Sequence, residues 1–277
     1  MYLNNVYEEA YISEVARQYQ QGTVLSQTVS QPKKIIGYKA YFPKSYGIVA
    51  HKSNKGDNVM YLNGDWEDIP CETESYEAPQ IVYDYDEHLF SFNEAVTLAK
   101  NASDSIGRAR DGQIILKGLI PTTTPELGGV GEVLNVKLLS KLSTQLDDNN
   151  VPDGDRYIVY TPAVLLQLLN DDKATNSDYA AVKALIKGDI ESFMGFKFVK
   201  IGKRKELSLP LNVSDKTVTC YAYHKDAVGS AVVQEQKTYI ERDASKSGWK
   251  HMTKVRIGSC LIENDGVIPF IVTTDNS

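Results

Sequence analysis

VPDGDRYIVYTPAVLLQLLNDDKATNSDYAAVKALIKGDIESFMGFKFVKIGK, residues Val151 to Lys203, is the stretch that decides the fold. Its β-branched and aromatic run Tyr157–Tyr160 predicts a short strand. Thr161-Pro162 suits the N-cap and the first position of a helix, which the following apolar residues continue. After a polar break, a second amphipathic segment leads to a β-rich run, Met194–Val199. Taken alone, the stretch predicts an α/β module and indicates no particular function.

A long helix is predicted upstream of this stretch. Ser91-Phe-Asn-Glu94 has the pattern of a capping box, and apolar residues then recur at intervals of three and four up to Ala109. This spacing predicts a helix from Phe92 to about Lys117. Such a helix would be roughly 40 Å long, well beyond the average for globular proteins.

A β-hairpin is predicted before that helix. Runs rich in Tyr, Ile and Val, at 35–50 and 59–69, flank the turn-forming residues Ser53–Asn58. They predict the two arms of a long hairpin. Because a lone two-stranded hairpin is marginally stable in water, this one must lie on its own body or on a neighbouring subunit.

The rest of the chain divides into shorter elements. Helical spacing from Tyr7 to Tyr19 predicts an N-terminal helix, and the polar residues Gln20–Pro32 are expected to be loosely held. Pro121–Gly131 is expected to be a flexible linker before a helix that ends at Asp147–Asn150. Strands are predicted at 217–223, 231–241, 250–262 and 267–273, with a tight loop at Arg242–Gly248.

Composition argues against several classes of protein. The chain has 277 residues, of which 42% are hydrophobic and 24% charged, as in ordinary globular proteins. With a net charge of −6, the chain lacks the excess of basic residues that is typical of a dedicated nucleic-acid-binding protein. This negative charge is consistent with a soluble protein, or with a shell wall that encloses a polyanion without adhering to it. We expect no membrane partner and no secretion, because no apolar run approaches the roughly 18 residues of a bilayer span and the first residues lack a signal-peptide pattern.

Side chains that carry chemistry are scattered along the sequence. The histidines form no metal-ligand pair and the cysteines no CxxC pair; they are His51, His88, His224, His251, Cys71, Cys220 and Cys260. Reduced thiols in a cytosol fit this pattern best. Gly128–Gly131 lacks the Gly-Lys-Ser/Thr of a phosphate-binding loop and is interpreted as a hinge. We therefore expect no metal ion and no cofactor.

One enzymatic alternative stays open. Cys220 and His224 can share one face of a strand, which would suit a Cys–His nucleophile. The more ordinary interpretation is a buried thiol near a strand end. A cytosolic Cys–His enzyme is thus the alternative from a different functional class.

Local motifs, taken in order, carry a resemblance to a known family. Arg108 with Asp111, or Arg110–Ile115, lies at the end of the predicted long helix, and Asp155-Arg156-Tyr157 precedes the Thr-Pro turn. Leu185–Gly188, Phe193–Phe196 and Ala222–Gly229 follow. With the order of hairpin, long helix, α/β module and β-rich return, this set resembles the major capsid proteins of tailed bacteriophages in the HK97-like superfamily. The likeness covers most of the chain from about Ser91 onward.

The resemblance implies an α+β, HK97-like capsid fold. Its parts would be an N-terminal arm (1–32), an extended β-hairpin or E-loop (33–85), a long spine helix with the first part of the peripheral domain (86–129), an axial domain (130–212), the return strands of the peripheral domain (213–250) and closing strands (251–277).

The same resemblance implies a structural role and no enzymatic activity. The protein would self-assemble into hexamers and pentamers of an icosahedral phage head around double-stranded DNA. It would be assembled in the host bacterial cytoplasm and reside in the virion capsid, with a portal protein and a separate scaffolding protein as partners. An encapsulin-like nanocompartment shell is the alternative within the same fold.

Contacts between subunits would come from the hairpin and from the loop at Arg242–Gly248, the latter near threefold axes. The candidate contact residues are Lys39, Lys44, Lys52, Lys55, Asp57, Glu241, Arg242, Asp243 and Lys246. Some relatives crosslink a hairpin lysine to a neighbouring asparagine, and Lys52 or Lys55 would supply that lysine. The axial domain would surround the fivefold and sixfold openings.

Overall fold

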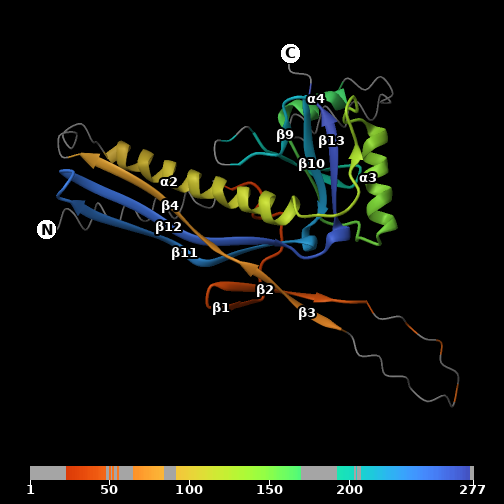
Figure 1. Cartoon of the computed structure of the whole chain (residues 1–277), viewed down its shortest axis with the longest axis horizontal. Helices are drawn as coiled ribbons and strands as arrows, with labels where there is room; N and C mark the ends of the chain where they lie inside the picture. Colours follow the sequence, from red (N-terminus) through yellow and green to blue (C-terminus); the bar gives the residue numbers. More distant parts are fainter. Residues whose placement is uncertain are drawn as a thin grey trace.

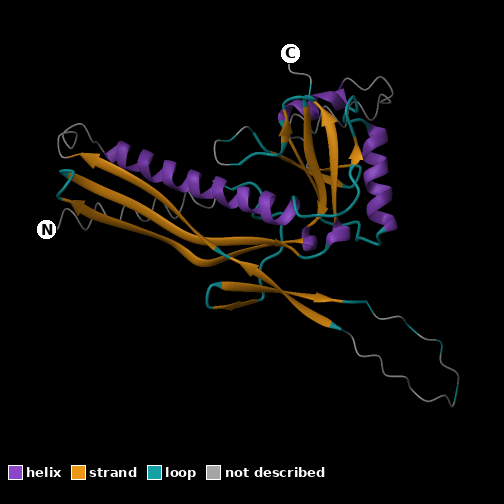
Figure 2. Ribbon diagram, viewed as in Figure 1, coloured by secondary structure: helices purple, strands orange, loops and turns teal. Residues whose placement is uncertain are grey.

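The computed structural model describes residues 23–47, 50, 52, 55, 65–83, 92–169, 192–202, 204 and 207–274. These residues form three parts (Figures 1 and 2). A long three-stranded sheet is backed by a long helix, a compact α/β domain lies at one end of that helix, and a hairpin projects away from both.

The long helix α2, Phe92–Gln113, lies along the long sheet and continues into a π-helical segment, η2, Ile114–Leu119. Ile106 on its inner face packs against Val255 of the sheet. The position of the predicted helix is confirmed. Its final turn widens into π geometry as the chain enters the core of the compact domain, where the apolar residues of η2 are buried.

The long sheet has the strand order β11-β12-β4, and both pairings are antiparallel. Its strands are β4, Glu74–Tyr83; β11, Val228–Asp243; and β12, Gly248–Leu261. The two long return strands and the tight loop between them are confirmed. The assignment of β4 to the hairpin is wrong. β4 pairs with β12 instead because Tyr76 and Ala78 pack with Ile106 beneath α2, an apolar contact that a projecting arm lacks.

The compact domain is a mixed sheet of order β5-β13-β10-β6-β8-β7, with β9 paired to β10. Two helices, α3 and α4, lie beside this sheet (Figure 2), and leucines of both are buried in the same core. The elements are β5, Leu127–Gly128; α3, Val136–Asp148; β6, Arg156–Tyr160; α4, Pro162–Leu169; β7, Ser192–Phe193; β8, Phe196–Lys200; β9, Leu211–Asn212; β10, Thr217–His224; η3, Lys225–Ala227; η4, Asn264–Gly266; and β13, Val267–Thr273.

Two strands therefore lie in other sheets than expected. β10 was placed with the peripheral return strands, but it is nearly all buried and so occupies the centre of the compact sheet, between β13 and β6. β12 was placed mainly with the closing strands, but it forms the middle of the long sheet. The predicted strand at Tyr157–Tyr160 is confirmed as β6, and all five of its residues are buried.

The hairpin consists of β2, Lys39–Ser45, and β3, Trp66–Glu72, with the short strand β1, Lys34–Ile36, along the other edge of β2. Its arms pair from Lys39 opposite Glu72 to Ser45 opposite Trp66. The predicted hairpin is thus confirmed near its base. Other expected features lie outside the described residues: the helix at 7–19, the hairpin tip at 56–64, Ser91 of the capping box, and the second amphipathic segment at 170–191.

The segment expected to be loosely held is firmly attached where it is described. Leu25 and Val29 are buried in the core of the compact domain. Ser30 forms a bridge with Gly229, donating its N–H to the Val228 carbonyl and accepting from the N–H of Ser230. The expectation for 23–32 is wrong because two apolar residues within the polar run anchor it.

The linker at 121–131 is also held along its length. Leu127–Gly128 pairs in parallel with β13, and the N–H of Gly129 donates to the Ile271 carbonyl at 3.1 Å. Gly128 has φ of 82°, and a Cβ there would stand 2.3 Å from the Ile271 oxygen, so this close approach requires glycine. The expected free hinge is instead a strand fastened to the sheet.

Thr161 occupies the expected helix start without the expected cap. The carbonyl of Thr161 accepts from the N–H of Val164 at 3.0 Å, so the turn is in place. The Thr161 hydroxyl is buried and has no hydrogen-bond partner among the described residues. Pro162 supplies the start of α4, and the side-chain cap is absent from that described part of the chain.

Candidate assembly surfaces

The hairpin meets the body at a small apolar joint. Ala40, Phe42 and Cys71 of the hairpin are buried together with Ala231 of β11. The ring of Phe42 lies flat against the backbone of Gly229, where a Cβ would stand 2.6 Å from the ring. This joint, defined by these five residues, fixes where the hairpin leaves the long sheet.

A single residue, Thr73, separates the hairpin strand β3 from β4 of the long sheet, and Arg256 holds it. The Arg256 guanidinium donates to the Thr73 hydroxyl at 3.1 Å and to its carbonyl at 3.2 Å. It also lies 4.1 Å from the centre of the Tyr38 ring, a cation–π contact. The Thr73 hydroxyl in turn donates to the Tyr38 carbonyl at 2.5 Å. Arg256 therefore holds Thr73, the single residue that links β3 to β4, and contacts Tyr38 just before β2.

Lys44 ties the hairpin to the compact domain. Its Nζ lies 3.1 Å from a carboxylate oxygen of Glu263, next to η4. Partial burial acts to lower the pKa of Lys44, but the hydrogen bond and charge of Glu263 outweigh it and the pKa is raised. Two residues further on, the Tyr46 hydroxyl donates across the hairpin to Glu67 on β3 at 2.8 Å. Lys44 thus already has a partner within its own chain.

The hairpin carries large apolar side chains in solvent, on β1 and its turn beside the joint and at the other end of β3. Trp66 is 74% exposed and Tyr38 65%, and Ile35 and Ile36 are about half exposed. They contrast with Phe42, which is 2% exposed on the inner side of the same hairpin. Large apolar side chains left exposed on a projecting hairpin are candidates for contact with another chain.

The loop at the far end of the long sheet is built around Asp243. Its carboxylate accepts from the N–H and the hydroxyl of Ser245 and lies 2.9 Å from Lys250 Nζ. These contacts, with the Ser245 hydroxyl foremost, lower the pKa of Asp243 to about 2. Ser247 closes the turn with φ of 45°. The loop is an ordered tip with a fixed shape.

The predicted contact residues fall on both surfaces. Lys39 pairs with Glu72 across the hairpin at 3.2 Å, and Lys52 and Lys55 are exposed further along it. Asp57 lies outside the described residues. At the loop, Arg242 stacks on Trp249 at 5.9 Å, Glu241 lies opposite Lys250, and the Lys246 N–H donates to the Asp243 carbonyl. Their role between subunits stays a prediction.

The motif residue Asp111 is the centre of a buried network that sequence patterns did not reveal. It is fully buried, and its carboxylate accepts from the N–H groups of Val24 and Leu25 at 3.1 and 3.0 Å. Thr23 donates its hydroxyl, and Arg204 a guanidinium N–H at 2.6 Å. Asp111 therefore joins the N-terminal segment, the spine helix and the loop after β8.

The motif residue Arg156 has a similar role in the compact domain. Its guanidinium is buried and contacts Asp147 at 2.7 Å and Asp153 at 3.1 Å. It also donates to the carbonyls of Val151 and Pro152. Arg156 thus joins the end of α3 to the start of β6, which gives a structural role to an arginine as the first residue of this strand.

The structure does not bring Cys220 and His224 together. They lie four residues apart on β10, roughly 13 Å along the strand. Cys220 is fully buried, and burial raises its pKa to about 12, so the reactive thiolate is disfavoured. His224 Nδ1 accepts from the N–H of Asp226 at 3.2 Å. A Cys–His nucleophile at these positions is not formed.

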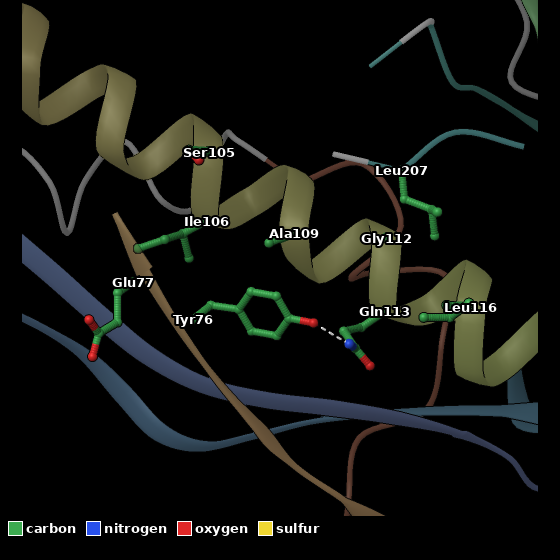
Figure 3. A pocket seen from close by; sticks show the side chains of 9 residues that line it. All are labelled: Tyr76, Glu77, Ser105, Ile106, Ala109, Gly112, Gln113, Leu116 and Leu207. Atoms are coloured by element: carbon green, nitrogen blue, oxygen red, sulfur yellow. Dashed lines mark hydrogen bonds between the residues drawn. The ribbon is translucent and has the colours of Figure 1, made fainter. Parts of the chain in front are cut away.

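A groove of about 410 Å³ lies between α2 and β4, closed on one side by Leu207. Figure 3 shows Tyr76 reaching across it to Gln113, whose amide also donates to Glu74 at 2.9 Å. Burial raises the pKa of Tyr76. The polar side chains hydrogen-bond to one another, so this groove is the packing interface between the helix α2 and the strand β4.

Metal and membrane sites were sought across the described ranges. No group of three or more His, Cys, Asp or Glu side chains in these ranges is placed to hold a metal ion. No helix within them is both long and apolar enough to cross a membrane.

The chain as a whole is similar to proteins of a known family. The family model described as phage capsid protein matches residues 3–271. No curated protein matches the sequence. Among solved structures, the chain is similar to the capsid of Cyanophage P-SCSP1u, with 16% identity, a TM-score of 0.64, and coverage of 91% of this chain and 89% of that one.

Two further structures are similar over most of their length. The head of Helicobacter pylori bacteriophage KHP40 has 12% identity and a TM-score of 0.69, covering 88% of each chain. The virus-like particle from Pyrococcus furiosus has 13% identity and a TM-score of 0.59, covering 95% of this chain and 98% of that one. These likenesses show the HK97-like α+β fold. The chain belongs to the phage capsid protein family and is a structural protein of the virion capsid.

Proposed function

We propose that this subunit assembles into hexamers and pentamers that form an icosahedral phage head around double-stranded DNA. Membership in the phage capsid family supports the shell role. The observation that carries the assembly proposal is the projecting hairpin with its exposed apolar side chains. Assembly in the host bacterial cytoplasm, before packaging, is part of the proposal.

The hairpin requires a surface to cover it. Beyond β1 the hairpin is a two-stranded ribbon, which is marginal alone, and its joint buries few residues in its own body. Trp66 faces solvent beyond that joint, and Tyr38 and Ile36 face solvent beside it. A neighbouring subunit is the partner that every shell position supplies, so we infer that the hairpin lies across an adjacent copy.

The remaining surfaces have separate roles in this proposal. The ordered tip around Asp243 contacts neighbours near threefold axes, with Glu241, Arg242 and Lys246 around it. The compact domain, within 130–212, surrounds the fivefold and sixfold openings. A hairpin lysine, Lys52 or Lys55, is the candidate for a crosslink to a neighbouring asparagine. Many weak contacts of these kinds sum to a closed shell.

Partners follow from the same proposal. A separate scaffolding protein sets the curvature during assembly, and a portal protein occupies one vertex. The net charge of −6 suits an inner wall that does not adhere to DNA. We propose no sequence-specific DNA contact, no cofactor and no reaction for this chain.

A nanocompartment shell is the second candidate. The likeness to the virus-like particle from Pyrococcus furiosus spans 95% of this chain and supports a shell of the same fold. The two candidates differ in what the particle encloses. Nuclease-protected DNA in particles from cells would support the phage head, and an enclosed enzyme would support the compartment.

A Trp66→Ser variant tests the assembly proposal. Because Trp66 is exposed in the subunit, its loss should leave the free energy of unfolding within about 0.5 kcal/mol of wild type. Assembly with the candidate scaffolding protein, followed by sedimentation and electron microscopy, should fall at least tenfold. Val130→Ser is the matched control, since Val130 is 73% exposed and lies outside the hairpin.

Two outcomes would count against the proposal. Normal assembly by Trp66→Ser would show that the hairpin apolar surface is not an interface. A wild-type protein that stays monomeric with the scaffolding protein, under all salt and concentration conditions, would remove the shell role itself. An equal loss in Val130→Ser would show that the effect is not specific to the hairpin.

A further inference from the structure

Two cysteines from different sheets meet at the joint. Cys71 lies on β3 of the hairpin and is fully buried, whereas Cys260 lies on β12 of the long sheet and is partly exposed. Both pack in the apolar cluster of Ala40, Phe42 and Ala231. They are 189 residues apart in sequence, and they come from the hairpin and from the long sheet.

Strand register explains why they meet. β4 pairs with β12 so that Glu74 lies opposite Ile257 at the end of the ladder. Continued in the same register beyond Thr73, the pattern would place Cys71 opposite Cys260. The backbones do stay close there, because a Cβ on Gly258 would stand 2.3 Å from the Glu72 oxygen and 2.9 Å from the Thr73 methyl.

This register suits a disulfide. Directly opposed residues of antiparallel strands have Cα atoms about 4.5–5.5 Å apart, within the roughly 4.4–6.8 Å that a disulfide spans. The thiols pack side by side, and the hydrogen bond from Cys260 lowers the pKa of Cys71 while it raises the pKa of Cys260. Cys220 offers a contrast, since it is buried in the separate core of the compact domain.

We propose that Cys71 and Cys260 form a redox-controlled disulfide that locks the hairpin to the long sheet. The oxidant is a small-molecule disulfide such as oxidised glutathione. The Cys71 thiolate accepts the proton of the partly exposed Cys260 thiol, and the Cys260 sulfur then attacks the oxidised glutathione, forms a mixed disulfide and releases one glutathione thiolate. Cys71 then attacks the Cys260 sulfur and releases the second. Two protein thiols are oxidised, two glutathione thiols are formed, and they take up the two protons.

The consequence rests on the proposed shell function. In a reducing cytosol the thiols stay free, and the hairpin can adjust its angle while subunits assemble. Once the particle meets an oxidising medium, the bond fixes the angle that assembly has selected. The lock closes within one chain, so it needs no neighbouring subunit to form.

Peptide mapping tests the bond itself. The full-length wild-type protein, unassembled, is incubated with oxidised or reduced glutathione, alkylated, digested and analysed by mass spectrometry. We expect a Cys71–Cys260 peptide pair after oxidation, with Cys220 still alkylated as a free thiol. Alkylation of all three thiols after oxidation, or a bond between chains or to Cys220, would overturn the proposal.

Hydrogen exchange tests the lock. Oxidation should slow exchange of the β2 and β3 amides at least tenfold in wild type and in the matched control Cys220→Ser, but not in Cys260→Ser. Equal exchange in oxidised and reduced wild type would remove the locking role even if the bond forms. Both measurements use unassembled protein, so they stand or fall separately from shell formation.

Discussion

The compact domain and the hairpin solve the problem of burial in opposite ways. In the compact domain, strands such as β6 and β10 are covered on both faces, and α3 and α4 close the core. The hairpin buries a small cluster at its base and leaves Trp66, Tyr38, Ile35 and Ile36 exposed. The first region encloses its own apolar core, whereas we propose that the second is completed by contacts with another chain.

This contrast distinguishes the residues that govern folding from those that govern assembly. Residues of the compact core should set the stability of the subunit. Residues of the hairpin should set what the subunit binds. Equivalent changes in the two regions should therefore have different consequences, and the following substitutions measure that difference.

The largest effect is expected from a matched pair of Phe→Ala variants. Phe196 is fully buried in the compact core, so Phe196→Ala should lower the free energy of unfolding by about 3–5 kcal/mol. Phe42→Ala removes an equally buried ring from the joint but should mainly speed hydrogen exchange in β2 and β3. Denaturant unfolding compares the two variants. Equal losses of global stability would show that hairpin and compact domain fold as one unit.

A smaller loss is expected when the buried network at Asp111 is broken. Asp111→Ala leaves the Arg204 guanidinium and the N–H groups of Val24 and Leu25 without their acceptor. Removing one partner of a buried ion pair costs about 3–5 kcal/mol, and partial exposure of Arg204 places the expected loss near 3. Thermal or denaturant unfolding measures it. Asp111→Asn is the control and should lose less, because an amide oxygen still accepts; an equal loss would point to charge alone.

Gly229→Ala probes the joint directly. The new methyl group would meet the Phe42 ring at 2.6 Å, so the ring must move. Overpacking of this kind costs about 1–3 kcal/mol, and we expect it to appear as faster exchange in the hairpin. Gly154→Ala, in open space, is the matched control. A loss of compact-domain stability without a change in the hairpin would contradict this assignment of the joint.

The smallest effect is expected at the loop tip and depends on pH. Asp243 has its pKa lowered from 3.8 to about 2 by Ser245 and Lys250. A lowered carboxyl pKa means that the stabilisation is complete above about pH 4 and is lost as the pH falls through 2. NMR of the tip amides should follow that titration, and Asp243→Asn should remove it. A midpoint near the ordinary value would show that the turn is not held by the carboxylate.

Local patterns predicted most elements but not their partners. The Thr217–Tyr223 run and the spacing from Phe92 onward predicted β10 and α2 because strand and helix periodicities are local properties. Which sheet a strand joins depends on residues far away in sequence. β4 follows the hairpin without a break apart from Thr73, and its pairing with β12 lies in contacts that no short window contains.

The same dependence on residues distant in sequence explains why the burial of surface residues was not predicted. The strand runs located the base of the hairpin and the polar run located the loop tip, but similar aromatic residues differ in burial on the hairpin: Phe42 is buried against Gly229 and Trp66 is exposed. The run at 23–32 is polar on average, so its attachment was missed. The Leu25 N–H in this run donates to the Asp111 carboxylate, 86 residues away in the sequence, and this contact exists only in the folded chain.

The single-residue crossover at Thr73 also decides how the subunit would carry a load. A pull along the hairpin passes through the backbone of β3 into β4. There it meets ten opposed residue pairs with β12, from Glu74 opposite Ile257 to Tyr83 opposite Gly248. Tension along β4 slides it past β12, so these pairs share the force together rather than yielding one after another. Internal pressure in a filled particle would thus be resisted by the whole length of the long sheet.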